Sequence, residues 1–196
     1  MEGHGLTSKQ SIRSKYLAYR DSLTKGERLE KSKKIWDNLK NETCFEEAEI
    51  VLVYMDYRSE VSTTELVKEL LMPCSNKRVF APKVEGMDIS FYEIHTLEEL
   101  VSGYQKIREP VGSDEALFTE ETAKMQKCLL LVPGAVFDRE LGRMGYGKGF
   151  YDRFLQRYDH ITRAGFAFEC QIAKQIPLEE HDKRMDMIVT ERQVIK

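Results

Sequence analysis

The segment from residue 142 to residue 153, GRMGYGKGFYDR, concentrates residue types that could bind a phosphorylated ligand. Its glycines let the backbone approach a ligand closely and turn successive N–H groups toward an anion. Arg143 and Lys148 add positive charge, and a helix beginning near Gly149 would add the positive end of its dipole. Asp152 follows closely, and a carboxylate beside phosphates can hold Mg²⁺. The segment therefore predicts a phosphate-binding loop with a metal ligand at its end.

Two common phosphate-binding patterns do not fit this loop. The dinucleotide pattern GxGxxG requires its third glycine one residue after Gly149. The pattern GxxxxGK[ST] fits from Gly142 to Lys148, but Gly149 then stands where a hydroxyl should ligate Mg²⁺. A flexible surface turn with solvated charges is the plain alternative. The aromatic pair that follows, Phe150 and Tyr151, weighs against that alternative because aromatic rings can stack on a flat ligand.

Composition limits the class of protein. The chain has 196 residues, 41% of them hydrophobic, so we expect one domain over residues 1–196. No apolar run is long enough for a membrane-spanning helix, and the N-terminus shows no signal-peptide pattern. The four cysteines stand apart with no CxxC pair, which argues against a zinc site or a disulfide framework and favours the cytoplasm. A net charge of −3 lacks the basic excess typical of nucleic-acid binding.

The elements that would position the loop alternate between helices and strands. Apolar spacing predicts a helix over residues 9–23, and a capping box at residues 24–27 starts a second helix. Continuous apolar runs at residues 49–55 and 128–133 predict buried parallel strands, because such strands are covered on both faces. The alternation indicates a three-layer α/β/α fold with a largely parallel central sheet. Loops at the carboxyl ends of such strands usually form the site.

Shorter patterns assign the remaining elements. We expect further strands at residues 78–84, 88–94, 161–168 and 185–191, and further helices at residues 62–71, 96–101, 149–158 and 170–176. Residues 103–127 are polar and weakly periodic, so we expect mostly loop there.

Beyond the loop itself, a longer stretch of the chain follows a known signature. Residues 132–155, VPGAVFDRELGRMGYGKGFYDRFL, closely resemble the signature of the 5-formyltetrahydrofolate cyclo-ligase family, also called methenyltetrahydrofolate synthetase. The segments 51–63, 78–84, 90–94, 106–110 and 185–191 occur in the order of that family and near its spacing. The N-terminal segment KQSIR, residues 9–13, resembles the Lys-x-x-x-Arg start of the family. The resemblance thus covers nearly the whole chain.

The resemblance implies an ATP- and Mg²⁺-dependent conversion of 5-formyltetrahydrofolate to 5,10-methenyltetrahydrofolate, with release of ADP and phosphate. The formyl oxygen would attack the γ-phosphate, N10 of the folate would then close the ring, and phosphate would leave. Such a reaction needs alignment and charge neutralisation rather than a nucleophilic side chain. The partners would be ATP and 5-formyltetrahydrofolate, with no nucleic acid and no membrane. Nothing in the sequence requires more than a monomer.

Functional positions of the family carry over where its motifs match this chain. For ATP, the resemblance implies Lys9, Arg13, Arg143, Gly145, Gly147, Lys148, Gly149, Phe150 and Tyr151. For the folate, it implies Met55, Glu60, Tyr146, Gly147, Lys148, Gly149 and Phe150. The implied Mg²⁺ ligands are Asp152 and Asp186. Arg143 and Lys148 take the catalytic role of neutralising the transferring phosphoryl group. The Glu60 carboxylate could accept hydrogen bonds from the flat N–H edge of the pterin.

Several of these residues also have an ordinary structural interpretation. The pair Lys9 and Arg13 could lie on a solvated helix face, and Met55 could belong to the core. Asp152 could be a helix first-turn acid, which the helix dipole favours, and Asp186 a strand-edge acid.

Three further positions leave questions about the site. Lys83 ends an expected strand and could either reach a phosphate or folate carboxylate or remain solvated. Phe150 stands where the family usually has tyrosine, which keeps the stacking face but removes a hydroxyl. Tyr146 stands where small or basic residues are common, so contact of the loop with folate could differ in detail.

Two alternative functions remain open on these residues. A different ATP-dependent phosphotransferase acting on a folate-like substrate would keep the loop and Asp152 but would not need Glu60. A non-catalytic folate- or nucleotide-binding protein would tend to lose Asp152 or Lys148, and both are present.

Overall fold

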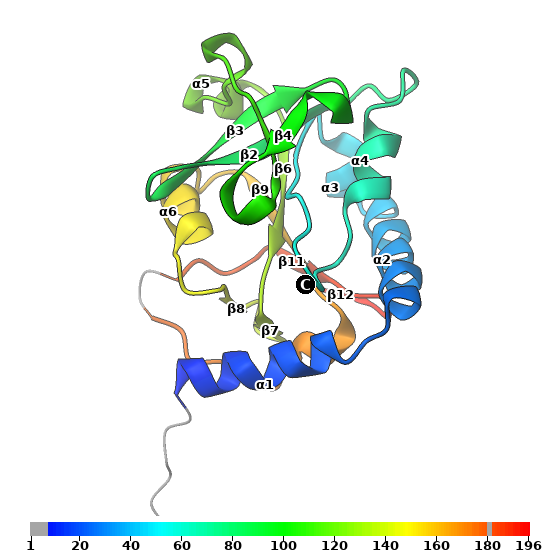
Figure 1. The fold of residues 1–196 in the computed structure, drawn as a ribbon, viewed down its shortest axis with the longest axis vertical. Coiled ribbons are helices and arrows are strands. Elements are labelled where there is room, and N and C mark those ends of the chain that lie inside the picture. Colours follow the sequence, from blue (N-terminus) through cyan, green and yellow to red (C-terminus); the bar gives the residue numbers. More distant parts are fainter. Residues whose placement is uncertain (1–7, 180–181) are drawn as a thin grey trace, which may run out of the picture.

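A computed structural model describes residues 8–179 and 182–196 of the chain (Figure 1). The α-helices are α1 (Lys9–Asp21), α2 (Lys25–Lys40), α3 (Thr43–Glu47), α4 (Thr64–Leu70), α5 (Glu120–Met125) and α6 (Phe150–Arg157). The strands are β1 (Ile50–Leu52), β2 (Arg78–Glu85), β3 (Asp88–Ile94), β4 (Leu100–Ser102), β5 (Arg108–Pro110), β6 (Cys128–Pro133), β7 (Val136–Asp138), β8 (Arg143–Met144), β9 (Thr162–Phe166), β10 (Ile172–Ala173), β11 (Met187–Val189) and β12 (Val194–Ile195). No helix in this part of the chain is long and apolar enough to cross a membrane.

Seven strands form the central sheet, in the order β12-β11-β9-β6-β1-β2-β3. The five inner strands are parallel, and β12 and β3 pair antiparallel at the two edges. The predicted α/β fold with a largely parallel sheet is therefore confirmed. Two smaller sheets accompany it, one of β10-β7-β8 and one of β4-β5.

The two faces of the sheet carry separate apolar layers. Along β1, Val51 packs with one layer, whereas Ile50 and Leu52 pack with the other, as the alternation of side chains in a strand requires. The first layer includes buried residues of α2 and α4, and the second includes buried residues of α5 and α6. These helices thus cover opposite faces of the sheet (Figure 1), which confirms the three-layer arrangement.

The hairpin of β2 and β3 extends beyond its neighbours. Only residues 78–80 of β2 pair with β1, whereas residues 79–85 all pair with β3. The outer half of the hairpin therefore stands free of the parallel sheet at the carboxyl end of β1. It can form one wall of a site there, because a side chain on this overhang faces the loops that leave the parallel strands.

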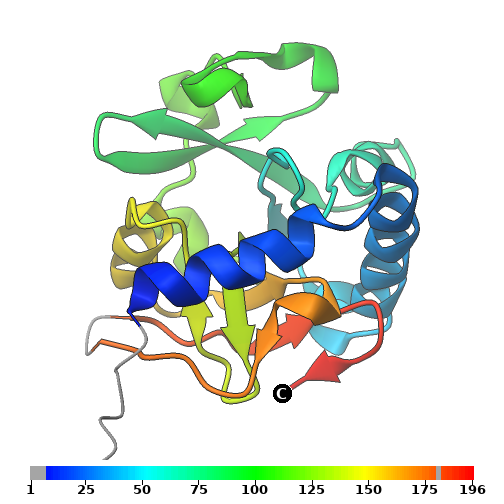
Figure 2. The same cartoon turned by 60° about the horizontal axis from the view of Figure 1, so that its bottom comes forward.

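Helix α1 closes the opposite side of this region. Ser8 caps its N-terminus by accepting a hydrogen bond from the Ser11 N–H. Its residues Ile12, Tyr16 and Leu17 pack against the small sheet of β7, β8 and β10. Figure 2 shows α1 crossing in front of this sheet, with the β2–β3 hairpin above it. The loops of the site therefore lie between a helix and a hairpin that are distant in sequence.

Local patterns predicted some elements well and others poorly. The strand at residues 128–133 and the capping box of α2 are confirmed. The strand predicted at residues 49–55 is shorter, because burial continues through Met55 after pairing has ended at Leu52. The capping box predicted at Ser62 is wrong, since Oδ1 of Asp56 accepts the Thr63 N–H at the start of α4.

Two further predictions need correction. Residues 170–176 were expected to be helical, but a 3₁₀ turn (Glu169–Gln171) leads into β10, which pairs with β7. The Gln171 side-chain amide donates to the carbonyls of Gly134 and Ala135, so tertiary hydrogen bonds override the local pattern. The segment 103–127, expected to be mostly loop, contains β5 and α5 as well as 3₁₀ turns.

Candidate active site

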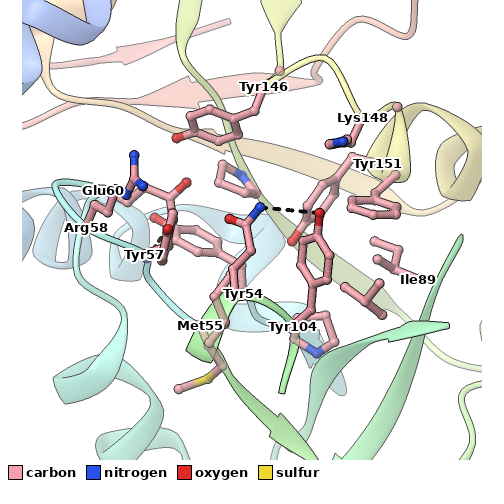
Figure 3. Close-up of a pocket in the computed structure, with 18 of the residues that line it drawn as sticks. Tyr54, Met55, Tyr57, Arg58, Glu60, Ile89, Tyr104, Tyr146, Lys148 and Tyr151 are labelled. Carbon is pink, nitrogen blue, oxygen red and sulfur yellow. Dashed lines mark hydrogen bonds between the residues drawn. The ribbon is translucent and has the colours of Figure 1, made fainter. Parts of the chain in front are cut away.

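A cavity of about 400 Å³ lies between α1, the overhanging hairpin and the glycine-rich segment (Figure 3). The lining residues are Leu17, Arg20 and Asp21 of α1; Tyr54, Met55, Tyr57, Arg58 and Glu60 after β1; Pro82, Val84 and Ile89 of the hairpin; Tyr104, Gln105, Ile107 and Glu109; Pro133; and Arg143, Gly145, Tyr146, Lys148, Gly149, Phe150, Tyr151 and Asp152. Both β1 and β6 end at this cavity, so it lies where the sequence predicts a site, at the carboxyl ends of parallel strands.

The glycine-rich segment adopts the backbone shape that its sequence predicts. Gly147 and Gly149 have φ angles of 90° and 69°, in the left-handed region that other residues rarely adopt. A Cβ atom at Gly145 would stand 2.8 Å from Nη1 of Arg143, so the absence of a side chain lets the backbone pass the guanidinium. Helix α6 begins directly after Gly149 and has no side-chain cap. Its first N–H groups therefore remain available to an anion.

Arg143 and Asp152 form an ion pair at the base of this segment. Nη2 of Arg143 lies 2.5 Å from Oδ1 of Asp152, and Nη1 donates to the Pro133 carbonyl at 3.2 Å. The arginine side chain is 3% exposed and that of the aspartate 24%. Nε of Arg143 is buried without a hydrogen-bond partner among the residues that the structure describes. The pair thus joins the end of β6 to the first turn of α6.

Lys148 supplies the second positive charge of the loop. Its side chain is exposed at the cavity wall, near Tyr151 in Figure 3. Within residues 8–179 and 182–196 its ammonium group has no ion-pair partner, whereas the Arg143 charge is already paired. Lys148 is therefore the loop cation that is most available to an incoming phosphate.

Glu60 lies on the other side of the cavity, at the end of the loop that follows β1 (Figure 3). The residue is 9% exposed, and its Oε2 accepts the Tyr57 N–H at 2.8 Å. Burial raises the pKa of Glu60, against the opposing effects of the Tyr146 hydroxyl, the Tyr57 N–H and the Arg20 charge. The carboxylate thus faces the cavity with acceptor capacity to spare.

Arg20 connects this carboxylate region to the glycine-rich segment. The residue is 4% exposed on the inner face of α1. Its Nε donates to Oγ of Ser59 at 2.9 Å, and its Nη1 donates to the Tyr146 hydroxyl at 2.5 Å. Ser59 in turn donates to Asp21. This contact of the loop with α1 therefore depends on the hydroxyl group of Tyr146.

Replacing Glu60 by glutamine is expected to stabilise the unliganded protein at neutral pH. A raised pKa means that the folded state binds this proton more tightly than the unfolded state, so stability is lost as the pH rises through the folded pKa. The neutral glutamine side chain would avoid that loss and still accept the Tyr57 N–H. Urea denaturation at pH 5 and pH 7.5 should show E60Q above the wild type, with the difference shrinking toward the lower pH. A less stable E60Q at pH 7.5 would mean that attraction to Arg20 outweighs the burial cost.

Aromatic side chains form much of the remaining wall. The rings of Tyr104 and Phe150 meet edge to face with centroids 6.0 Å apart. The guanidinium of Arg143 lies 5.7 Å from the ring centroid of Tyr151. Burial raises the pKa of Tyr151 and that of Tyr54, so both phenols stay neutral. Such walls suit a flat, partly apolar ligand and exclude water around it.

The structure brings most of the predicted residues together. Arg143, Gly145, Tyr146, Lys148, Gly149, Phe150, Tyr151, Asp152, Met55 and Glu60 all line the cavity. Arg13 lies just outside it, where its Nε donates to the Gly145 carbonyl at 2.8 Å. A Cβ atom at Gly147 would stand 3.9 Å from the same guanidinium. Arg13 therefore supports the loop from its outer side.

Gly147 is not among the lining residues, and three further predicted residues lie farther away. Nζ of Lys9 lies 2.8 Å from Glu179 and 3.1 Å from Asp182. Burial alone would lower the pKa of Lys9, but these two carboxylates raise it above its ordinary value. Lys83 donates to the Val111 carbonyl. Both oxygens of Asp186 accept from Arg163. The proposed contacts of Lys9 with ATP and of Asp186 with Mg²⁺ remain predictions, and each would require a present ion pair to open.

The carboxylate that best fits a metal in this cavity is Asp152. Its Oδ1 is engaged by Arg143, which leaves Oδ2 for another partner. Over residues 8–179 and 182–196, no three His, Cys, Asp or Glu side chains are grouped to hold a metal ion. Mg²⁺ in nucleotide sites is commonly held by one or two carboxylates together with phosphates and water. The cavity thus fits a Mg²⁺ ion that arrives with a nucleotide better than a metal held by protein alone.

Sequence reasoning missed several lining residues. Arg20 follows Tyr16 by four positions and so shares the inner face of α1, and a charged residue at such a position is a signal that could have been used. Tyr104 and Glu109 come from the segment that was expected to be mostly loop. Their approach to the cavity depends on β5 and the turn before it, which have no strong local pattern.

The chain is similar to known proteins over most of its length. Residues 6–191 match the model of the 5-formyltetrahydrofolate cyclo-ligase family. The 5-formyltetrahydrofolate cyclo-ligase of Escherichia coli strain K12 is 31% identical over 153 residues, which cover 75% of this chain and 80% of that protein. The Mus musculus protein of the same name is 26% identical over 198 residues, covering 94% of each. The NMR structure of Aquifex aeolicus 5,10-methenyltetrahydrofolate synthetase matches with a TM-score of 0.82 at 35% identity, over 95% of this chain and 91% of that one.

Proposed function

The chain belongs to the 5-formyltetrahydrofolate cyclo-ligase family, and from this we propose that it converts 5-formyltetrahydrofolate to 5,10-methenyltetrahydrofolate with consumption of ATP. The observation that carries the proposal is the composition of one cavity. A glycine-rich loop with Lys148 and the Arg143–Asp152 pair lines the same space as the buried carboxylate Glu60 and a set of aromatic walls. Phosphate chemistry and recognition of a flat heterocycle can therefore take place side by side.

The reaction has to turn the formyl oxygen into a leaving group. In the proposed course, that oxygen attacks the γ-phosphorus of ATP, and ADP leaves. N10 of the folate then attacks the formyl carbon, loses its proton, and the carbon–oxygen bond to phosphate breaks. The protein contributes by aligning oxygen with phosphorus and by neutralising negative charge, as is usual in phosphoryl transfer.

Loop residues carry the phosphate part of this chemistry. Lys148 is the exposed cation for the transferring phosphoryl group, and the uncapped N–H groups after Gly149 can receive phosphate oxygens. Arg143 holds Asp152 in place and adds its charge to the same region. Arg13 and Lys9 on α1 would engage the phosphates farther from the reacting centre. Mg²⁺, when bound, would neutralise charge on the phosphate oxygens, and Asp152 is the residue that would hold it.

Residues on the opposite side of the cavity would bind the folate. Glu60 would accept hydrogen bonds from the N–H edge of the pterin, because a carboxylate offers two acceptor oxygens to two adjacent donors. Met55 and Tyr54 would cover the ring, and Phe150 and Tyr146 would border it from the loop. Excluding water there protects the phosphorylated intermediate from hydrolysis.

The test is a near-ultraviolet absorbance assay for methenyl folate with purified protein, 5-formyltetrahydrofolate, ATP and Mg²⁺. The proposal expects absorbance to rise only when both ATP and Mg²⁺ are present, with one ADP formed per methenyl product. ATP consumption without methenyl product would favour a phosphotransferase with a different acceptor. Tight folate binding without any turnover would instead indicate a binding protein.

A further inference from the structure

The cavity contains a second buried carboxylate that the mechanism above does not use. Glu109, in β5, is 7% exposed and lines the cavity. It belongs to a different wall from Glu60, since it packs beside Gly103, the residue before Tyr104. Figure 3 shows Glu60 and Tyr104 on opposite sides of the cavity. The two buried carboxylates therefore approach the same space from two directions.

Glu109 has few partners for a buried charge. Its Oε1 is 3.4 Å from the Val84 N–H, which is long for a hydrogen bond to a carboxylate. Among the residues that the structure describes, no cation pairs with it. The two buried arginines of the cavity are directed elsewhere, since Arg143 pairs with Asp152 and Arg20 donates to Ser59. Burying a carboxylate with so little compensation is costly, so a further donor is expected when the site is filled.

The chain leaves room for this carboxylate at Gly103. A Cβ atom there would lie 2.0 Å from Oε2 of Glu109 and 2.3 Å from its carboxyl carbon. The backbone angles of Gly103, φ −113° and ψ −139°, lie outside the regions that other residues commonly adopt, so the backbone shape also favours glycine here. The space that glycine provides here is therefore occupied by the Glu109 carboxyl group.

We propose that Glu109 accepts a hydrogen bond from an N–H group of the folate substrate, as a second recognition carboxylate opposite Glu60. This inference rests on the proposed function. The folate substrate has N–H donors beyond the edge assigned to Glu60, namely N8–H of the reduced pterin ring and N10–H of the arylamine that closes the new ring. Two carboxylates on opposite walls fix the ring in its plane and in its direction, which a single carboxylate at one edge cannot do. Glu109 is thus a substrate-binding residue that sets the orientation of the folate.

Two variants test the inference by different physical routes. Glu109→Gln keeps the size of the side chain and an acceptor for Val84 but removes the charge. Gly103→Ala keeps the charge but places a Cβ atom where the carboxyl group lies, so it displaces that group. Because the ψ angle of Gly103 also favours glycine, the affinity of this variant is read together with its melting temperature. Each is expected to weaken binding of 5-formyltetrahydrofolate, and to raise its KM, by about 10- to 100-fold, the range for loss of a hydrogen bond to a charged group. The KM for ATP should stay unchanged, because among the described residues no hydrogen bond or ion pair joins Glu109 to the glycine-rich loop.

The matched control is Glu98→Gln, which removes an exposed carboxylate from the preceding segment and should change neither constant. Binding of 5-formyltetrahydrofolate is measured directly by titration, beside turnover and the melting temperature. If wild-type protein binds and converts the folate but E109Q and G103A bind it equally well, the inference is wrong and the proposed function stands. A lower melting temperature with an unchanged folate KM would assign Glu109 a purely structural role. Wild-type protein that binds no folate would overturn both proposals.

Discussion

Lys148→Met is expected to lower turnover by about 100- to 1,000-fold with almost no loss of stability. The effect on turnover corresponds to removal of one preorganised group that stabilises transition-state charge. Stability should change little because the Lys148 side chain is exposed and its ammonium group pairs with no carboxylate in the described part of the chain. The measurement is kcat for methenyl folate formation together with the urea midpoint of unfolding.

The control for this variant is Lys124→Met. Lys124 is an exposed lysine of α5 whose ammonium group lies 3.8 Å from Glu120, away from the cavity. Its replacement changes the net charge by the same amount and should leave kcat within about twofold, because exposed ion pairs contribute little. Equal losses of activity in the two variants would assign the effect to overall charge. A K148M variant with normal turnover would remove Lys148 from the catalytic role.

The sheet and its layers were predictable because they rest on burial, which the sequence records directly. A strand such as β6 is covered on both faces, so all of its residues are apolar and stand out as a run. The same reasoning explains why β1 was predicted too long. The apolar run shows that the segment is buried, but it does not show where pairing with the neighbouring strands ends. The small sheet of β7, β8 and β10 was missed because strands of two or three residues are too short to show a period.

The residues of the candidate site likewise divide into those that could be predicted from the sequence and those that could not. The glycine-rich loop was predictable because each requirement falls within a few residues: positive φ at Gly147 and Gly149, a close approach at Gly145 and a helix start at Phe150. Arg20 and Glu109 were not predictable, since their positions depend on contacts between segments that are far apart along the chain. Resemblance to the family supplied Glu60 but neither of these two. A site formed by one continuous segment can be predicted from its local sequence. The residues of a cavity wall come together only in the folded structure, so they cannot be predicted in this way.

Asp152 presents the largest expected effect on stability, because it balances a buried charge. The Arg143 side chain is 3% exposed, and Asp152 is its only ion-pair partner among the described residues. Removing one partner of a buried pair leaves an uncompensated charge, at a cost of about 3 kcal/mol. Asp152→Ala should therefore lower the free energy of unfolding by about that amount. Loss of activity in this variant alone would not separate a metal ligand from a structural counterion.

Asp152→Asn separates the two roles. Asparagine keeps an oxygen where Oδ1 accepts from Arg143, so the cost in stability should fall to about 1 kcal/mol, near that of one weakened hydrogen bond. As a metal ligand it is much weaker, since Mg²⁺ prefers charged carboxylate oxygens. Titration of turnover with Mg²⁺ should therefore show a requirement about tenfold or more above that of the wild type. A folded D152N with an unchanged Mg²⁺ requirement would reduce Asp152 to a counterion of Arg143.

Asp186→Asn completes the comparison, because Asp186 is the other implied metal ligand. It lies outside the cavity lining, and both of its oxygens accept from Arg163. If Asp186 binds Mg²⁺ during turnover, it must first leave Arg163, and D186N would then raise the Mg²⁺ requirement as D152N does. If Asp186 serves only the ion pair with Arg163, D186N would lower the urea midpoint slightly and leave the Mg²⁺ titration unchanged. The existing pairing of both oxygens favours the second outcome, so we expect the requirement to depend on Asp152 alone.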